Sequence, residues 1–372
     1  MSDKYVFNCS TNIIGGAVQN SVNFILQIHE HNELHKWFFI LSYEVFEQVS
    51  SVVNSENSLV ISSPAKSFVS RIKIKKIVKK LSPRFVYTSA GPAYVNFDAF
   101  HIMGCSNPYI LGASKQAYDL TTNKFTYFIR ILHNKYQRYY IKKADHWFLQ
   151  TEKSRQQMTL NGVSIDDCSI VYNAVAPSFL DCNPNFKKLH LNSIVRVLVP
   201  SAYYPHKNLK ILIELLKKEG VSSRLHFSLT ISEDSYKSFS LQPGFDEVSN
   251  NISNIGSFSH KDAASIYAKF DVVFLPSVLE VFSTSYIEAI AMKMPLIVPD
   301  LPFSKSICGD YALYYKSDSI DDCLNAFSEI FVYQKNIDRY EEFREKIIEK
   351  FSNQEDRYKK ILDKVLSLTG GV

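Results

Sequence analysis

Two glutamates, Glu280 and Glu288, lie where the sequence pattern changes from a buried strand to a helix. The run at residues 271–275 is short and apolar, which is typical of a strand buried on both faces. Helical spacing of apolar residues begins near Thr284. In an open parallel sheet, ligands bind at such strand-to-helix crevices. Carboxylates accept hydrogen bonds from hydroxyls, and the N–H groups of a helix start bind phosphate. The pattern therefore predicts a site for a ligand that carries both groups, such as a nucleotide sugar.

Strand and helix patterns alternate along the chain, which predicts an α/β protein with parallel sheets. Short apolar runs in the first half indicate strands at residues 5–9, 38–41, 59–61, 85–87 and 147–149. Runs in the second half indicate strands at residues 195–199, 227–231, 271–275 and 296–298. Because 372 residues exceed what one core usually serves, we expect two Rossmann-like domains that face each other across a cleft.

The expected domains are residues 1–173 and 194–352. Between them, residues 174–193 are predicted to form a linker, because residues 181–193 are polar, contain Pro184 and show no hydrophobic period. Residues 353–372 carry a helix pattern that we expect to pack back on the first domain.

Composition excludes several classes of protein. A hydrophobic content of 46% with 21% charged residues is typical of a globular chain rather than a disordered one. The six cysteines lack the spacing of a zinc site, which favours reduced core thiols in a cytosolic protein. The N-terminus shows no secretory signal, and no run of about 18 apolar residues predicts a membrane-spanning helix. We therefore expect a soluble or peripheral protein.

Basic residues are concentrated in the first half, where no acid occurs between Glu56 and Asp98 or between Asp119 and Asp145. In the second of these stretches, basic and apolar residues recur at helical spacing: Lys135, Arg138 and Lys142 with Phe128, Ile129, Leu132 and Tyr136. A basic amphipathic helix predicts contact with an anionic membrane surface. Nucleic acid is not expected as a partner, because no nucleic-acid-binding module accompanies the charge.

The segment from Glu280 to Glu288 resembles the E-x7-E signature of the retaining glycosyltransferases of family four, which have the GT-B fold of two Rossmann-like domains. Four further landmarks resemble family motifs and follow in the family's order: Gly15-Gly16, Val171-Tyr172-Asn173, Tyr204-Pro205-His206-Lys207-Asn208 and Ile255-Gly256. The resemblance covers nearly the whole chain. It implies that the first domain binds the acceptor and that the second binds the nucleotide sugar.

The resemblance also implies roles for single residues. Glu280 would contact the transferred sugar, Lys207 would hold the diphosphate, and Glu288 would bind the ribose. Further donor contacts are expected from His206, Phe282, Ser283, Thr284, Ser285 and Gly16. Two polar residues are predicted to cap helices, Asn208 just after Lys207 and Thr151 after the strand at residues 147–149.

Contacts to the acceptor or to the sugar are expected from Gly15, His101 and Asn107, although a structural role for His101 fits the sequence equally well. The family often has an arginine where this chain has Ala202, and His206 is a candidate substitute. Val281 replaces a glycine that the family usually has after the first glutamate. These departures leave the donor sugar and its nucleotide open.

The predicted function is transfer of a sugar from a UDP- or GDP-linked donor to a hydroxyl of a lipid-linked glycan, as in bacterial O-antigen or capsule assembly. The expected location is cytoplasmic and peripheral, at the inner face of the cytoplasmic membrane. No Asp-x-Asp motif stands where a metal site would need one, so neither a metal nor another cofactor is expected. Two alternatives stay open: a nucleotide-sugar epimerase of the same architecture, and a non-catalytic sugar-nucleotide-binding partner.

Overall fold

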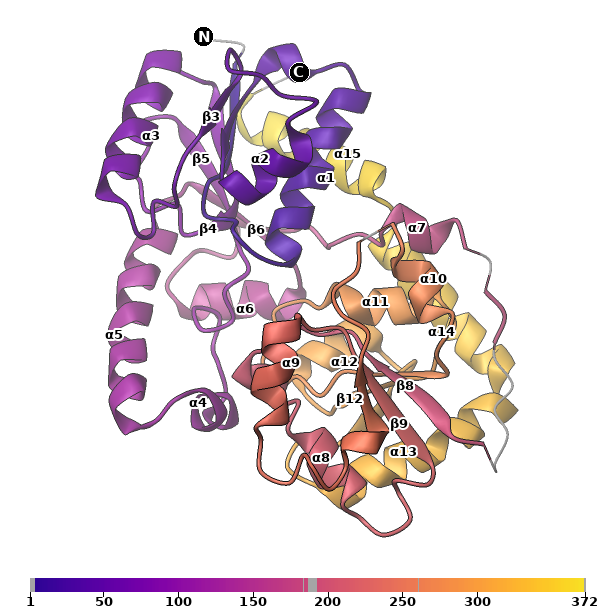
Figure 1. The fold of residues 1–372 in the computed structure, drawn as a ribbon. Helices are drawn as coiled ribbons and strands as arrows, with labels where there is room; N and C mark the ends of the chain where they lie inside the picture. The colour runs from indigo at the N-terminus through magenta and orange to yellow at the C-terminus, as the bar shows by residue number, and fades with distance from the viewer. Residues whose placement is uncertain (1–3, 183, 187–192, 260, 371–372) are drawn as a thin grey trace. The chain divides into compact units, whose positions relative to one another are not determined.

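The computed structural model describes residues 4–182, 184–186, 193–259 and 261–370, which form two compact units (Figure 1). The first unit holds residues up to 113, residues 124–174 and the residues from 354 onward, and the second holds residues 114–123 and 175–353. The predicted boundaries placed residues 114–123 in the first domain. They belong to the second unit because their helix α4 (Lys115–Thr121) packs against the 3-10 turn η2 (Pro205–Lys207).

The first unit is built on a seven-stranded parallel sheet with the strand order β3-β2-β1-β4-β5-β6-β7. Its strands are β1 (Tyr5–Cys9), β2 (Trp37–Leu41), β3 (Ser58–Val60), β4 (Phe85–Gly91), β5 (Phe100–Cys105), β6 (His146–Leu149) and β7 (Cys168–Ile170). Its helices are α1 (Gly16–Glu30), η1 (Leu34–Lys36), α2 (Tyr43–Val49), α3 (Phe68–Leu81), α5 (Lys124–Ile141), α6 (Glu152–Leu160) and α15 (Gln354–Leu368).

Alternation along the strands divides the core of the first unit between the two faces of its sheet. Phe7 and Phe39 pack with residues of α1, α2 and α15, whereas the neighbouring Val6 and Ile40 pack with α3. The last helix, α15, lies against α1 in this unit (Figure 1). A hydrogen bond of 2.7 Å from the hydroxyl of Tyr358 in α15 to the carboxylate of Glu33 helps to fix it there.

The second unit is built on a six-stranded parallel sheet with the order β10-β9-β8-β11-β12-β13. Its strands are β8 (Val195–Val199), β9 (Leu225–Leu229), β10 (Ile252–Asn254), β11 (Val272–Phe274), β12 (Leu296–Pro299) and β13 (Leu313–Tyr315). Its further helices are α7 (Pro177–Leu180), α8 (Ile211–Leu216), α9 (Glu233–Ser240), η3 (Ser249–Asn251), α10 (Ala263–Tyr267), α11 (Thr284–Ala291), α12 (Pro302–Cys308), α13 (Ile320–Lys335) and α14 (Ile337–Phe351).

Both sheets are wholly parallel, which confirms the predicted α/β class with two Rossmann-like sheets. In the second sheet, β8, β9 and β10 follow one another outward in one direction from the centre. The strands β11, β12 and β13 follow one another outward in the opposite direction. The carboxyl ends of β8 and β11 therefore form the switch point at which ligands bind in such sheets.

Part of the predicted linker is folded into the second unit. Helix α7 packs against α10 and α11, and the Phe179 ring lies 5.2 Å from the ring of Tyr267. The remainder of the predicted linker includes residues 183 and 187–192, which lie outside the described residues.

All six cysteines are free, and five of them are buried. Within the described part of the chain, no helix combines the length and apolarity needed to cross a membrane.

Candidate active site

The loop after β11 leads directly into helix α11, whose first residue is Thr284. Ser283 stands at the cap position, but its side chain makes no capping hydrogen bond, and the first turn contains no acidic residue. The first N–H groups of a helix have no partners within the helix, and the helix dipole makes this end positive. The start of α11 is therefore suited to bind an anionic group such as a phosphate.

Lys207 and Glu280 form an ion pair beside this helix. Their side chains are only 17% and 14% exposed. The loops that carry them are fastened together, because the carbonyl of His206 accepts hydrogen bonds from the N–H of Val278, at 2.8 Å, and from the hydroxyl of Ser277, at 3.3 Å. The chain thus holds a cation and a carboxylate in one place at the switch point of the second sheet.

Asn208 does not cap the start of α8, so this prediction was wrong. It has left-handed backbone angles, φ 52° and ψ 37°, and follows the 3-10 turn η2, whereas helix α8 begins only at Ile211. Asparagine is one of the few residues that adopt this conformation readily. The left-handed turn ends η2 directly after Lys207 and redirects the chain into α8.

His206 lies in the same loop, with its ring stacked on that of Tyr204 at a centroid distance of 5.7 Å. Burial lowers the pKa of His206, the nearby Lys207 lowers it further, and Glu280 opposes the shift. The ring is therefore mostly neutral at neutral pH. It offers a ligand a hydrogen bond, but it does not replace the positive charge that an arginine at position 202 would supply.

Glu288 is nearly buried in α11, with 7% of its surface exposed. The hydroxyl of Tyr267 donates a hydrogen bond of 3.0 Å to its carboxylate. Burial raises the pKa of Glu288 to about 7, although hydrogen bonds from Tyr267, Thr284 and Ser285 act in the opposite direction. At neutral pH this group therefore exchanges readily between its protonated and ionised forms.

Other predicted donor residues surround the start of α11. The hydroxyl of Ser285 reaches the carbonyl of Pro200 at the end of β8, at 3.5 Å, and the ring of Phe282 packs edge-on against that of Phe351. Val281 is 7% exposed, so its side chain is part of the core rather than of an open loop.

Two tyrosines near the site were not identified from the sequence. Tyr267 holds Glu288, and the fully buried hydroxyl of Tyr286 has no hydrogen-bond partner among the described residues. Tyr286 stands at an unspecified position of the E-x7-E segment, and Tyr267 lies outside every motif. Tyr267 lies 21 positions before Glu288, a separation that no helix or strand period connects.

Gly15 and Gly16 lie in the first unit, at the start of α1. Gly15 has φ 62°, a conformation that favours glycine, whereas Gly16 needs no such freedom. A Cβ atom at either position would meet no protein atom within 4 Å. The close approach of a ligand to this pair stays a prediction.

His101 has a structural role in the first unit, and its predicted sugar contact stays a prediction. Its side chain is 1% exposed. One ring nitrogen lies 2.9 Å from the hydroxyl of Thr88, and the other lies 3.0 Å from the carbonyl of Lys143. Burial lowers the pKa of His101 to about 4. The ring is thus neutral, and both of its nitrogens are occupied within the first unit.

Asn107 organises the turn after β5. Its amide donates to Gln137 at 3.1 Å, and its side-chain oxygen accepts the N–H of Tyr109 at 3.0 Å. These hydrogen bonds explain why an asparagine stands at this position without invoking a ligand. The acceptor contact of Asn107 stays a prediction. Among the described residues, no group of three or more His, Cys, Asp or Glu side chains is arranged to hold a metal ion.

Residues 186–356 match the sequence pattern of the family described as "Glycosyl transferases group 1". This segment contains Lys207, Glu280 and Glu288. No curated protein sequence matches the chain.

Solved structures with a similar fold cover almost the whole chain. A glycosyltransferase from Rickettsia africae ESF-5 superposes with a TM-score of 0.69 at 13% identity, over 98% of each chain. The lipopolysaccharide outer core galactosyltransferase WaaB superposes with a TM-score of 0.67 at 15% identity, over 98% of this chain and 99% of that chain. Anabaena HepE, solved with UDP and glucose, superposes with a TM-score of 0.67 at 13% identity, over 98% of this chain and 99% of that chain.

At these identities the superpositions establish the GT-B-like fold, and the family match covers residues 186–356, which carry the ion pair and the buried glutamate. Residues 186–356 are thus similar to the group 1 glycosyltransferases, and the whole chain has the fold of solved glycosyltransferases.

Proposed function

We propose that the protein transfers a hexose from a UDP- or GDP-linked donor to a hydroxyl of a lipid-linked glycan during assembly of a cell-surface polysaccharide. The observation that carries this proposal is the Lys207–Glu280 ion pair beside the uncapped start of α11. It combines a cation, a carboxylate and N–H groups where a sugar diphosphate needs all three.

The departing diphosphate requires the most stabilisation, because negative charge develops on it as the bond to the sugar breaks. Lys207 and the first N–H groups of α11 would supply that stabilisation. Glu280, which is paired with Lys207, would accept hydrogen bonds from sugar hydroxyls. Glu288 would accept hydrogen bonds from the ribose through its ionised form.

The choice of donor and acceptor follows the similar structures. HepE was solved with UDP and glucose, and WaaB is a galactosyltransferase of the lipopolysaccharide outer core. A UDP-hexose is therefore the first donor to test, and a lipid-linked oligosaccharide is the first acceptor.

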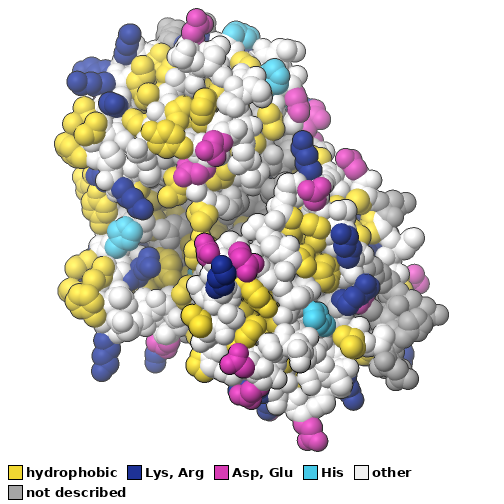
Figure 2. All heavy atoms as spheres, in the orientation of Figure 1, with side chains coloured by type: hydrophobic (Ala, Val, Ile, Leu, Met, Phe, Trp, Pro, Cys, Tyr) yellow, Lys and Arg dark blue, Asp and Glu magenta, His cyan; other side chains and the backbone are white. Residues whose placement is uncertain are grey.

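The surface of α5 supports a location at an anionic membrane. The residues that α5 buries include the polar Asn134 and Gln137, whereas Phe125 and Phe128 are 74% and 62% exposed. Helix α3 adds exposed apolar residues and five lysines, and Arg71 of α3 donates a hydrogen bond of 2.7 Å to the hydroxyl of Tyr136 in α5. Figure 2 shows apolar and basic side chains together on the side of the first unit formed by these helices. Apolar side chains among cations suit the interface of an anionic bilayer.

Transfer is tested by incubating the protein with labelled UDP-glucose, UDP-galactose or GDP-mannose and a lipid-linked oligosaccharide acceptor. We expect acceptor-dependent incorporation of one sugar, with the anomeric configuration of the donor retained in the NMR spectrum of the product. A changed donor sugar in the absence of acceptor would indicate an epimerase instead. No turnover of any donor would favour a non-catalytic partner.

Membrane contact is tested by sedimentation with phosphatidylglycerol vesicles. The double variant Phe125→Ser, Phe128→Ser should bind them more weakly than the wild type. Leu241→Ser is the matched control, because Leu241 is 85% exposed but lies in the second unit. Equal vesicle binding by both variants would contradict the role of α5.

A further inference from the structure

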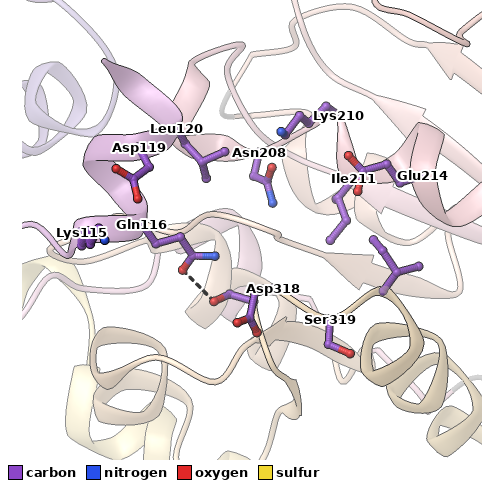
Figure 3. Close-up of a pocket in the computed structure, with 12 residues that line it drawn as sticks. Lys115, Gln116, Asp119, Leu120, Asn208, Lys210, Ile211, Glu214, Asp318 and Ser319 are labelled. Atoms are coloured by element: carbon purple, nitrogen blue, oxygen red, sulfur yellow. Dashed lines mark hydrogen bonds between the residues drawn. The ribbon is translucent and has the colours of Figure 1, made fainter. Parts of the chain in front are cut away.

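The second unit contains a cavity of about 450 Å³ beside α4, the start of α8 and the loop that leads into α13 (Figure 3). Its volume falls within the range of about 300–1,000 Å³ that small-molecule sites occupy. None of the proposed donor residues lines this cavity.

Asn208 is the central polar group of the cavity. It is 7% exposed, and Figure 3 shows its amide directed into the open space. The side chain makes no hydrogen bond to any group in the described part of the chain. Its amide atoms are open to the cavity rather than buried in the protein. A ligand in the cavity would supply the hydrogen bonds that this amide lacks.

A second amide faces the same space from α4. The side-chain oxygen of Gln116 accepts a hydrogen bond of 2.8 Å from the hydroxyl of Ser317, which fixes the amide with its NH₂ group available to a ligand (Figure 3). Each amide offers both donors and an acceptor. Hydroxyl groups both donate and accept, so a ligand with several hydroxyls matches this pair.

The charges around the cavity nearly balance. Lys115 and Lys210 face Asp119, Glu214 and Asp318, which gives two cations and three anions. A phosphate ligand would require an excess of cations, and a metal ion would require converging carboxylates. A neutral polar ligand satisfies this lining best.

Apolar groups also contribute to the lining. Leu120 and Asn208 border the cavity and also a second hollow of about 290 Å³, which is lined by Tyr203 and Tyr204. Aromatic faces and aliphatic side chains pack against the C–H groups of a sugar ring, while polar groups bind its hydroxyls. The two adjoining hollows provide room for more than one ring.

We propose that this cavity is a second carbohydrate-binding site, which holds sugar rings of a glycan other than the ring that reacts. The site is separate from the donor site but adjoins it, because Asn208 directly follows Lys207 in the chain. Carbohydrate binding here requires neither a nucleotide nor a transfer reaction, so the proposal stands or falls independently of the proposed function.

The test is saturation-transfer NMR on the full chain without nucleotide, using methyl α-glucopyranoside, methyl α-galactopyranoside and methyl α-mannopyranoside as probes. Asn208→Gly removes the amide and keeps the left-handed backbone. Asn32→Gly is the matched control, because Asn32 has φ 57° and is exposed in the first unit. We expect Asn208→Gly to weaken binding of the preferred probe about fivefold to tenfold, as for the loss of one or two hydrogen bonds. Asn32→Gly should bind it like the wild type.

Absence of saturation transfer to all three probes would overturn the proposal, as would unchanged binding in Asn208→Gly. Loss of the signal in Glu280→Ala but not in Asn208→Gly would place the sugar in the donor site instead. The α-linked trisaccharide of the preferred monosaccharide should bind more tightly than its methyl glycoside, because it spans both hollows. Equal affinities would contradict a glycan occupant and indicate a free sugar.

Discussion

Replacing Glu288 by glutamine should make the stability of the protein less dependent on pH. The carboxyl is nearly buried, and burial raises its pKa from the ordinary glutamate value of 4.5 to about 7. A folded-state pKa above the unfolded value means that folding favours the protonated form. The stability associated with the protonated carboxyl is fully present below about pH 4.5 and is lost as pH rises through about 7. Glutamine cannot ionise, so the variant should not show this loss.

The size of the effect follows from the shift. A difference of about 2.5 pKa units corresponds to about 3 kcal/mol, at about 1.4 kcal/mol per unit. Relative to its value below pH 4.5, the gap in unfolding free energy between variant and wild type should therefore grow by about 3 kcal/mol and level off above about pH 7. The change in this gap stabilises the variant relative to the wild type at high pH.

Urea unfolding at a series of pH values, followed by far-UV circular dichroism, measures this gap. Trp37 and Trp147 both lie in the first unit, so tryptophan fluorescence follows that unit in the same samples. Glu247→Gln is the control, because Glu247 is an exposed member of a surface ion pair in the second unit. A gap that stays constant with pH, or that favours the wild type at high pH, would refute the assignment of Glu288 as a buried carboxyl with a raised pKa.

The remaining predictions concern the same site and the histidine of the first unit. The affinity for UDP should rise up to about tenfold per pH unit below pH 7 and level off above it, because ribose hydroxyls donate to the ionised Glu288; a flat calorimetric profile would contradict this. Tyr267→Phe removes a hydrogen bond that lowers the pKa of Glu288, so the midpoint of that profile should move to higher pH, and an unchanged midpoint would argue against the contact. His101→Leu should cost about 1–3 kcal/mol of stability through loss of the ring's hydrogen bonds with the Thr88 hydroxyl and the Lys143 carbonyl, with normal transfer per folded molecule. Lost transfer at normal stability would restore His101 to the site.

The positions of many strands were predictable from the sequence, because a buried strand appears as a local run of apolar residues. The predicted strands at residues 5–9 and 195–199 coincide with β1 and β8. In contrast, β13 is a three-residue Leu-Tyr-Tyr segment that is too short to show a period, and it was not predicted. Local hydrophobic patterns thus identified many of the strands, including the short edge strand β3, but they missed β13.

Polar residues at turns show the limits of predicting helix caps from local sequence. Thr151 caps α6 as predicted, and its hydroxyl accepts the N–H of Ser154 at 3.0 Å. Asn208 resembles a cap in sequence, yet it adopts the left-handed conformation that asparagine also favours, and the sequence does not distinguish the two. The packing of α4 against η2 and the hydrogen bond from Tyr267 to Glu288 join distant segments. Such contacts depend on the complete fold.

Transfer by Glu280→Ala tests most directly whether the Lys207–Glu280 pair lies at the reaction centre. The acceptor assay with labelled donor should show a loss of about a hundredfold or more, as expected when a group that binds the reacting sugar is removed. Glu247→Ala is the matched control, because it removes a glutamate from the ion pair with Lys217, on the surface of the same unit. We expect near-normal transfer from the control and unchanged circular dichroism in both variants. Near-normal turnover by Glu280→Ala would contradict the assignment of this pair as the donor site.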